Sequence, residues 1–226
     1  MFIHIRGVLT PQEVAHARAV MEAAPWIDGH ATSGEQASLV KTNRQLATGS
    51  PQARELGELV LNALGRNLIF NSAALPLRVL PPMFNRYDTG MRFGTHVDNC
   101  IRAVPEGPRM RADVSSTLSF TDPDEYDGGE LNVEDAHETR SVKLPAGDMI
   151  LYPTVSLHSV STVTRGTRWS SFFWTQSLVK DNGQRAILHE LDLAIMQVRR
   201  GLPDDDLGVL RLTNTYHKLL RQWSEL

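Results

Sequence analysis

The chain lacks the features that mark several classes of protein. Cys100 is the single cysteine among 226 residues, so an intramolecular disulfide is excluded. No apolar run approaches the ~20 residues of a membrane-spanning helix, and the N-terminus has no basic stretch followed by an apolar run. The 23 Lys and Arg are scattered, and together with 26 Asp and Glu they give a net charge of -3. We therefore expect a cytoplasmic protein that binds neither membrane nor nucleic acid.

Nothing rich in Pro or Ser and nothing of low complexity divides the chain, and 41% of its residues are hydrophobic. A chain of this length and composition can bury one sizeable core. We predict three segments: an N-terminal helical and strand segment over 1–78 that packs on the core, a β core over 79–178, and a C-terminal helical extension over 179–226.

A His-x-Asp triplet is the most informative feature that is present. His96-Val97-Asp98 is followed later in the chain by His158 and then by Arg168. Two histidines and one carboxylate hold a non-haem iron on one face and leave positions open for chemistry. In an extended strand, His96 and Asp98 point the same way because side chains alternate between faces. An arginine nearby suits a carboxylate, because its planar fork matches carboxylate geometry.

Each of these residues also has a structural interpretation. An apolar strand can bury a neutral histidine such as His158 when backbone groups satisfy its ring nitrogens. Arg168 can form a surface salt bridge. Cys100, two residues after Asp98, is a further possible ligand, although a small residue near the mouth of a pocket is the favoured interpretation.

Short strands separated by turns surround these residues. We predict strands over 84–87, 113–120, 130–133, 149–152 and 157–163, and another that begins at Arg168. Gly128-Gly129 and Arg165-Gly166 are typical of hairpin turns. The second hairpin would place Arg168 on the strand beside that of His158.

Several sequence runs together resemble the bacterial PKHD-type hydroxylases, over nearly the whole chain. The runs are Phe84-Asn85-Arg86-Tyr87, Gly94-Thr95-His96-Val97-Asp98, Tyr126-Asp127-Gly128-Gly129-Glu130-Leu131, Leu144-Pro145-Ala146-Gly147-Asp148, Leu151-Tyr152-Pro153, Ser156-Leu157-His158, Val163-Thr164-Arg165-Gly166-Thr167-Arg168 and Trp174-Thr175-Gln176-Ser177. This family consists of iron(II)- and 2-oxoglutarate-dependent oxygenases similar in domain to prolyl and lysyl hydroxylases.

The resemblance implies a mainly β fold with flanking helices, in which the core is a double-stranded β-helix, or jelly-roll. It makes His96, Asp98 and His158 the ligands of Fe(2+) and Arg168 the anchor of 2-oxoglutarate, with Tyr87 as a weaker candidate for contact with the co-substrate. L-ascorbate is the implied reductant. Phe93 and Ser119 depart from the family pattern, in which tyrosine and a bulky apolar residue are expected. We expect these two departures to affect how the substrate fits.

The implied function is hydroxylation of an unactivated C–H bond with release of succinate and CO2. Two kinds of substrate stay open: a prolyl or lysyl residue of a protein, and a small molecule related to iron uptake. Two rival functions also stay open. One is a metal jelly-roll enzyme that does not use 2-oxoglutarate, in which Arg168 is dispensable; the other is a non-catalytic, iron-responsive binding module.

Helices are predicted outside the β core. Thr10-Pro11-Gln12-Glu13 is a capping box before a helix, and Ser50-Pro51 begins a second helix. Two C-terminal helices carry apolar residues at helical spacing: Ile187, Leu188, Leu191, Ala194, Ile195 and Val198, then Leu210, Tyr216, Leu219, Leu220 and Trp223. Such a pair either packs on its own domain, which the stripe favours, or forms a homodimer interface.

Two loops are candidates for control of access to the metal. The 99–112 segment contains Arg102, Arg109 and Arg111 and is long enough to act as a basic lid that steers an acidic substrate. A solvated charged loop explains the same residues. The acidic 121–130 segment is expected to be an exposed turn and to supply no metal ligand.

Overall fold

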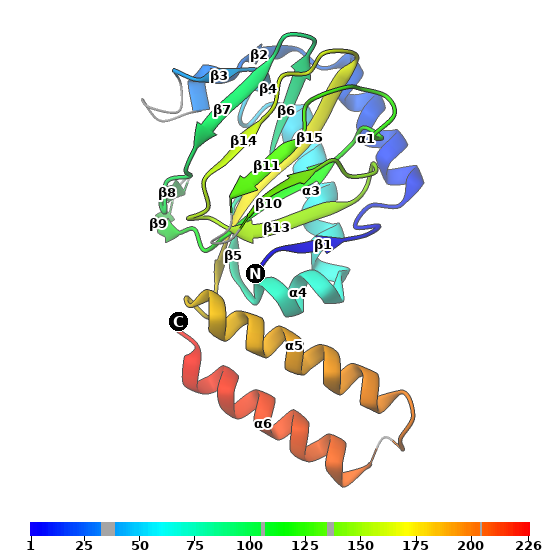
Figure 1. The fold of residues 1–226 in the computed structure, drawn as a ribbon, viewed down its shortest axis with the longest axis vertical. Coiled ribbons are helices and arrows are strands. Elements are labelled where there is room, and N and C mark those ends of the chain that lie inside the picture. Colours follow the sequence, from blue (N-terminus) through cyan, green and yellow to red (C-terminus); the bar gives the residue numbers. More distant parts are fainter. Residues whose placement is uncertain (33–38, 105–106, 135–137, 204) are drawn as a thin grey trace.

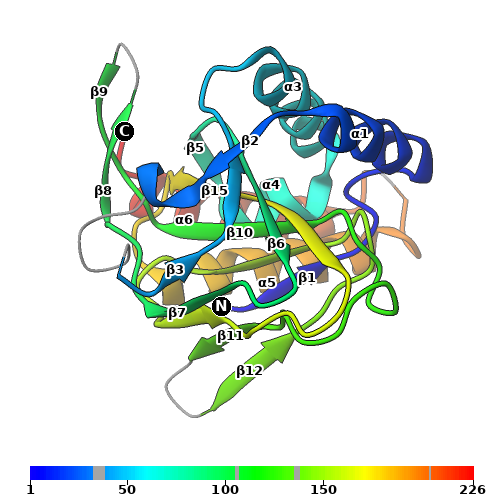
Figure 2. The ribbon, with the colours of Figure 1, turned by 90° about the horizontal axis from the view of Figure 1, so that it is seen from above.

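The computed structural model describes residues 1–32, 39–104, 107–134, 138–203 and 205–226. Within these residues, two antiparallel sheets lie face to face (Figures 1 and 2), and they confirm the predicted jelly-roll core with helices at both ends of the chain. The eight-stranded sheet has the order β1 (Ile3–Ile5), β13 (Met149–Pro153), β10 (Val114–Ser119), β15 (Thr167–Ser177), β6 (Met83–Asp88), β4 (Arg44–Leu46), β2 (Trp26–Asp28), and β5 (Pro76–Val79) also pairs with β15. The five-stranded sheet has the order β12 (Thr139–Val142), β11 (Leu131–Glu134), β14 (His158–Val160), β7 (Arg92–His96), β3 (Lys41–Thr42).

The prediction of a loop over 99–112 is wrong, because most of this segment forms a β-hairpin. Strands β8 (Ile101–Val104) and β9 (Gly107–Arg111) pair with each other as a small separate sheet. Residues 105–106 lie outside the described residues. The hairpin connects the end of the Asp98 segment to β10, so its inner face lies close to the predicted site.

The two N-terminal helices form as predicted. In α1 (Pro11–Ala23) the Thr10 hydroxyl accepts a hydrogen bond from the Glu13 backbone, and the Glu13 carboxylate accepts one from the Thr10 backbone at 2.8 Å. The Ser50 hydroxyl caps α3 (Pro51–Arg66) by accepting a hydrogen bond from the Ala53 backbone at 3.2 Å. Both helices cover the outer face of the large sheet (Figure 2). A short helix, α4 (Leu68–Ala74), and a 3-10 turn, η1 (Gly29–Thr32), were not predicted.

The C-terminal helices α5 (Asn182–Arg199) and α6 (Leu207–Trp223) lie antiparallel below the sheets, with α5 against α4 (Figure 1). A small core joins them to the rest of the chain: Leu75, Val179 and Leu188 are buried together, and Tyr216 and Trp223 pack against them. The pair therefore packs on its own domain, as the stripe favours, and these contacts lend no support to a homodimer. Ile187 and Val198 are exposed on the far side of α5. No helix among the described residues has the length and apolar character to span a bilayer.

Both predicted hairpin turns are wrong, because each glycine segment carries the chain from one sheet to the other. Strand β10 pairs with β13 and β15, whereas β11 pairs with β12 and β14, so 120–130 crosses between sheets. The 161–166 segment likewise connects β14 to β15 of the opposite sheet. The two crossings pack on each other: the Asp127 amide donates to the Arg165 carbonyl at 3.0 Å, and the Thr164 amide donates to the Asp127 carbonyl at 2.8 Å.

Gly128 is required where the crossings meet. Its φ is +69°, and an added Cβ would clash with the carbonyl oxygen of Thr162. We expect Gly128→Ala to lower the free energy of unfolding by at least about 2 kcal/mol, through strain at positive φ and this overlap. Gly65→Ala is the control, because Gly65 lies in α3 with open space around it and alanine there stabilises by up to about 1 kcal/mol. Urea denaturation of both variants measures the difference; equal stability would contradict this role of Gly128.

Candidate active site

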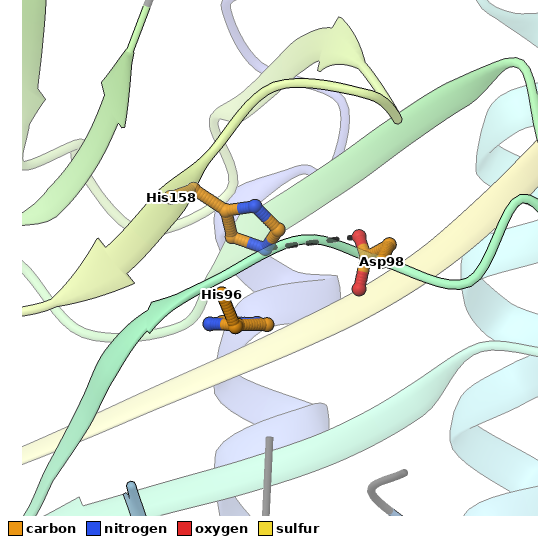
Figure 3. Close-up of side chains that lie close together, drawn as sticks. All are labelled: His96, Asp98 and His158. Atoms are coloured by element: carbon orange, nitrogen blue, oxygen red, sulfur yellow. Dashed lines mark ion pairs between the residues drawn. The ribbon is translucent and has the colours of Figure 1, made fainter. Parts of the chain in front are cut away.

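His96, Asp98 and His158 come together where two neighbouring inner strands of the five-stranded sheet end (Figure 3). His96 is the last residue of β7 and His158 the first of β14, and the two are direct cross-strand partners. Side-chain alternation would place Asp98 on the same strand as His96. Instead, Asp98 lies two residues beyond the end of β7. One ligand atom from each side chain lies within 4.8 Å of the others, so the three residues can hold one metal ion.

Both histidines are oriented by backbone carbonyls. Nδ1 of His96 lies 2.9 Å from the Gly94 carbonyl oxygen, and Nδ1 of His158 lies 3.0 Å from that of Ser156. Because a carbonyl only accepts, each Nδ1 must carry the proton, which leaves the lone pair on Nε2 for a metal. Phe93 stacks on the His96 ring with centroids 3.6 Å apart and holds its orientation.

Two side chains that sequence reasoning missed hold Asp98. Its Oδ2 accepts a hydrogen bond from the Ser115 hydroxyl and one from the Trp174 indole nitrogen, both at 2.9 Å. Ser115 lies on β10 and Trp174 on β15, so the large sheet orients a ligand that follows a strand of the small sheet. The same Oδ2 lies 3.7 Å from Nε2 of His158, so these bonds orient the carboxylate toward the other ligands. The alternating polar residues of β10 were the one sequence signal for this contact.

These donors give a prediction for metal affinity. Ser115→Ala and Trp174→Phe each remove one hydrogen bond to Asp98 and leave the other. Loss of an outer partner of a metal ligand costs about 10- to 100-fold in affinity, so we expect weaker iron(II) binding by that factor in each variant. Competition with a chelator under nitrogen measures it. Ser116→Ala, a neighbouring buried serine with no such bond, is the control; wild-type affinity in both Ser115→Ala and Trp174→Phe would contradict the role assigned to these donors.

His96 is held in its neutral form. Burial, followed by the nearby His158, lowers the pKa of His96 to about 4. In the unfolded chain the pKa returns to about 6.5. Between pH 6.5 and 4 the unfolded chain binds a proton that the folded protein does not, so the stability that this group contributes is present above pH 6.5 and is lost as the pH falls toward 4.

The pH dependence of the metal-free protein tests this state of His96. We expect urea stability to fall by about 2 to 3 kcal/mol more in the wild type than in His96→Gln when the pH is lowered from 7.5 to 4.5. Glutamine carries no titrating proton, so the variant subtracts the contribution of all other groups. The same fall in both proteins would show that His96 is not kept neutral by the fold.

Arg168 faces this cluster from the opposite sheet. It lies on β15, not on a strand beside β14, so the predicted arrangement is corrected: His158 and Arg168 approach from two sheets across one cavity. The side chain is 6% exposed, and no carboxylate of the described residues lies within 4.0 Å of it. Its Nη1 donates to the Ser170 hydroxyl at 2.7 Å. The surface salt bridge is therefore excluded, and a buried guanidinium without a counter-ion predicts a bound anion.

The cavity between the sheets is open to solvent on one side and measures about 500 Å³ including that opening. Tyr87 and Tyr152 line it, and the guanidinium of Arg168 lies 5.4 Å from the centre of the Tyr87 ring. Burial raises the pKa of both phenols, so each hydroxyl stays neutral and can donate. This space can take a small dicarboxylate between the metal ligands and Arg168.

The remaining predicted residues lie around the site. Phe93 lines the cavity, and Ser119 lines a smaller hollow beside Arg168 while its hydroxyl donates to the Thr121 carbonyl at 2.9 Å. Cys100 is exposed and is not part of the ligand cluster, so the interpretation of thiolate ligation loses its support.

Known protein families and solved structures match this chain. A model of the 2OG-Fe(II) oxygenase superfamily matches residues 82–176, and a model of the PKHD-type hydroxylase C-terminal domain matches residues 182–225. Among solved structures, a prolyl-4-hydroxylase from Pseudomonas putida covers 77% of this chain and 92% of its own, with a TM-score of 0.52 and 17% identity. A prolyl hydroxylase from Trichoplax adhaerens covers 82% and 86%, with a TM-score of 0.55 and 13% identity. At these identities the likeness concerns the fold.

Full-length relatives are much more similar in sequence. A PKHD-type hydroxylase from Cupriavidus metallidurans is 61% identical over 100% of both chains. One from Gluconobacter oxydans is 60% identical, and the PKHD-type hydroxylase PiuC of Pseudomonas aeruginosa is 52% identical, each over 100% of both chains. The chain therefore belongs to the PKHD-type hydroxylases, which are 2-oxoglutarate- and iron(II)-dependent dioxygenases.

Proposed function

We propose that this chain hydroxylates an unactivated C–H bond, with iron(II) on His96, Asp98 and His158 and with 2-oxoglutarate anchored by Arg168, and releases succinate and CO2. The observation that carries the proposal is the position of Arg168: a buried guanidinium, without a carboxylate partner in the described part of the chain, lies across one cavity from the three candidate ligands. A dicarboxylate that chelates the metal at one end places its other carboxylate at that guanidinium.

The donor set fits iron(II). Two imidazoles with free Nε2 and one carboxylate are the ligands such an iron takes, and they leave positions for the co-substrate and dioxygen. When bound, the iron and 2-oxoglutarate supply the activation of dioxygen. The protein positions and shields: Ser115 and Trp174 hold Asp98, and Arg168 neutralises the far carboxylate.

Tyr87 extends this co-substrate site in our proposal. Its buried, neutral hydroxyl lies in the cavity that Arg168 lines, where it can donate to a carboxylate oxygen. We further propose ascorbate as the reductant that keeps the iron in its working state, a cytoplasmic location, and the division into 1–78, 79–178 and 179–226 as functional segments of the chain.

The substrate is proposed at the level of class. A prolyl or lysyl residue of a protein and a small molecule related to iron uptake both suit a cavity that opens to solvent on one side. Two of the similar structures are prolyl hydroxylases, and that activity is known of those proteins.

The test of the proposed function is oxygen-dependent formation of succinate from 2-oxoglutarate by the iron-loaded protein, with and without ascorbate. Slow succinate formation without added substrate supports the oxygenase. Turnover of another substrate that needs iron but not 2-oxoglutarate would favour the rival metal enzyme. Iron binding without any 2-oxoglutarate binding or turnover would favour the binding module.

A further inference from the structure

Arg102 is a second cation beside the site that the proposed mechanism does not use. It lies on β8, the strand that follows the Asp98 segment, and its guanidinium carbon lies 3.3 Å from the centre of the Trp174 ring. The same indole donates to Asp98 Oδ2. The charge of Arg102 also acts on Asp98 and on Lys41, both of which line the cavity. Arg102 therefore flanks the open side of the iron cavity.

The guanidinium of Arg102 has no hydrogen bond or ion pair with any described residue, although it is half-buried. The other arginines of this hairpin differ. Arg111 forms ion pairs with Asp113 at 2.7 Å and with Glu225 at 3.0 Å, so it holds the hairpin to the C-terminus. Arg109 is exposed on the outer side. Of the three, Arg102 alone stacks on a wall of the cavity and has no hydrogen-bond partner among the described residues, so its donors are available to an anion.

Lys41 adds a second positive charge to the same side of the cavity. Its side chain is buried, lies with Nζ 5.3 Å from the centre of the Phe93 ring and donates to the Gly29 carbonyl at 2.7 Å. Burial lowers the pKa of Lys41 to about 8, so the ammonium form still predominates at pH 7. The acidic groups that act on it are Asp28, which is exposed, and Asp98.

The charges of the loaded centre do not neutralise Arg102. Iron(II) brings two positive charges, against one negative charge on Asp98; 2-oxoglutarate brings two negative charges, against one positive charge on Arg168. The centre is then neutral, and Arg102 adds a positive charge beside a partly desolvated cavity. A field of this sign raises the local concentration of anions and disfavours cationic substrates.

Apolar side chains line the same cavity. Phe93, Leu131, Val160, Phe172 and Trp174 are among them. An apolar lining of this kind suits a ligand with an apolar body.

We infer that the substrate of this site carries an oxyanion, a carboxylate or a phosphate, next to an apolar body, and that Arg102 binds this oxyanion at the edge of the iron cavity. The inference rests on the proposed function and specifies its substrate class. It assigns the β8–β9 hairpin to substrate recognition and Lys41 to the supporting field. A charge-assisted contact of this kind is expected to change affinity about 10- to 100-fold.

The experiment uses the full chain loaded with Mn(II) and saturated with 2-oxoglutarate, so that no turnover occurs and the co-substrate position is filled. The probes are benzoate, phenyl phosphate and the uncharged benzamide. Paramagnetic relaxation of the probe protons measures binding close to the metal. The variants are Arg102→Gln, Arg102→Lys, and Arg109→Gln as the matched control on the same hairpin.

We expect at least one of the two anions to bind the wild type about tenfold or more tightly than benzamide, and the better of them identifies the oxyanion. Arg102→Gln should reduce anion binding to the level of benzamide, Arg102→Lys should retain part of it, and Arg109→Gln should leave it unchanged.

Equal binding of anions and benzamide, absence of saturable anion binding, or equal losses at Arg102 and Arg109 overturns the inference. A fall in 2-oxoglutarate affinity in Arg102→Gln also overturns it, because Arg102 would then serve the co-substrate. A wild type that binds no 2-oxoglutarate refutes the proposed function itself, so the two failures are distinguishable.

Discussion

Replacement of Asp98 by alanine is expected to reduce iron(II) affinity at least 100-fold and to abolish 2-oxoglutarate oxidation with it. Asp98 is the one anionic ligand of the cluster, and hydrogen bonds from Ser115 and Trp174 hold it in place. Removal leaves two neutral imidazoles, which bind a hard divalent ion much more weakly. Competition with a chelator of known affinity, under nitrogen, measures the change.

Asp124→Ala is the matched control for this variant. Asp124 is an exposed carboxylate on the segment that crosses between the sheets, and it is not part of the cluster. Its replacement should leave both iron affinity and turnover unchanged. Wild-type iron affinity in Asp98→Ala would mean that the metal binds elsewhere.

Replacement of Arg168 by glutamine is expected to raise the Kd for 2-oxoglutarate about 100-fold, which corresponds to about 2.7 kcal/mol, while iron(II) affinity stays unchanged. Glutamine keeps polarity and much of the side-chain volume but removes the charge and the fork that matches a carboxylate. The loss is large because the guanidinium is buried and no carboxylate of the described chain competes for it. Calorimetry with the Mn(II)-loaded protein measures both affinities.

Arg165→Gln is the control for the anchor. Arg165 lies three residues earlier and is exposed, with an ion pair to Asp127 at 2.7 Å, so its loss should not alter 2-oxoglutarate binding. If Arg168→Gln binds 2-oxoglutarate as tightly as the wild type does, the anchor is assigned wrongly, and the metal enzyme without 2-oxoglutarate becomes the better account.

Local sequence information pointed to the three candidate ligands, which the structure brings together, and to the helix starts. The triplet His96-Val97-Asp98 places two ligands within three residues. His158 lies at the start of its strand, and pairing of that strand with the strand of His96 brings the ligands together. The capping box at Thr10, the N-cap Ser50 and the proline after each determine where the two helices start. These features depend on neighbours in sequence.

Strand partners could not be predicted in the same way. Gly128 and Gly166 have positive φ, as turn residues should, but each lies in a crossing between sheets rather than in a hairpin. The chemistry of a turn specifies the local bend and not the strand that pairs after it. The position of Arg168 opposite His158, and not beside it, follows from these crossings.

Some residues of the site were not predicted from the sequence for the same reason. Ser115, Trp174 and Lys41 are each distant in sequence from the ligands and enter the cavity from β10, β15 and β3. Nothing in their own sequence neighbourhood points to a metal, since serine and tryptophan are common in strands. Their function is visible only through contacts with Asp98 and Phe93.

The most direct test of the central claim is an anaerobic titration of the iron(II)-loaded protein with 2-oxoglutarate, followed by the visible charge-transfer absorption of an iron-chelated 2-oxo acid. The account predicts a band that needs both iron and 2-oxoglutarate, saturates at one equivalent per chain, is absent in Asp98→Ala, and requires about 100-fold more 2-oxoglutarate in Arg168→Gln. Absence of the band in the wild type, or the same titration curve in wild type and Arg168→Gln, would contradict it.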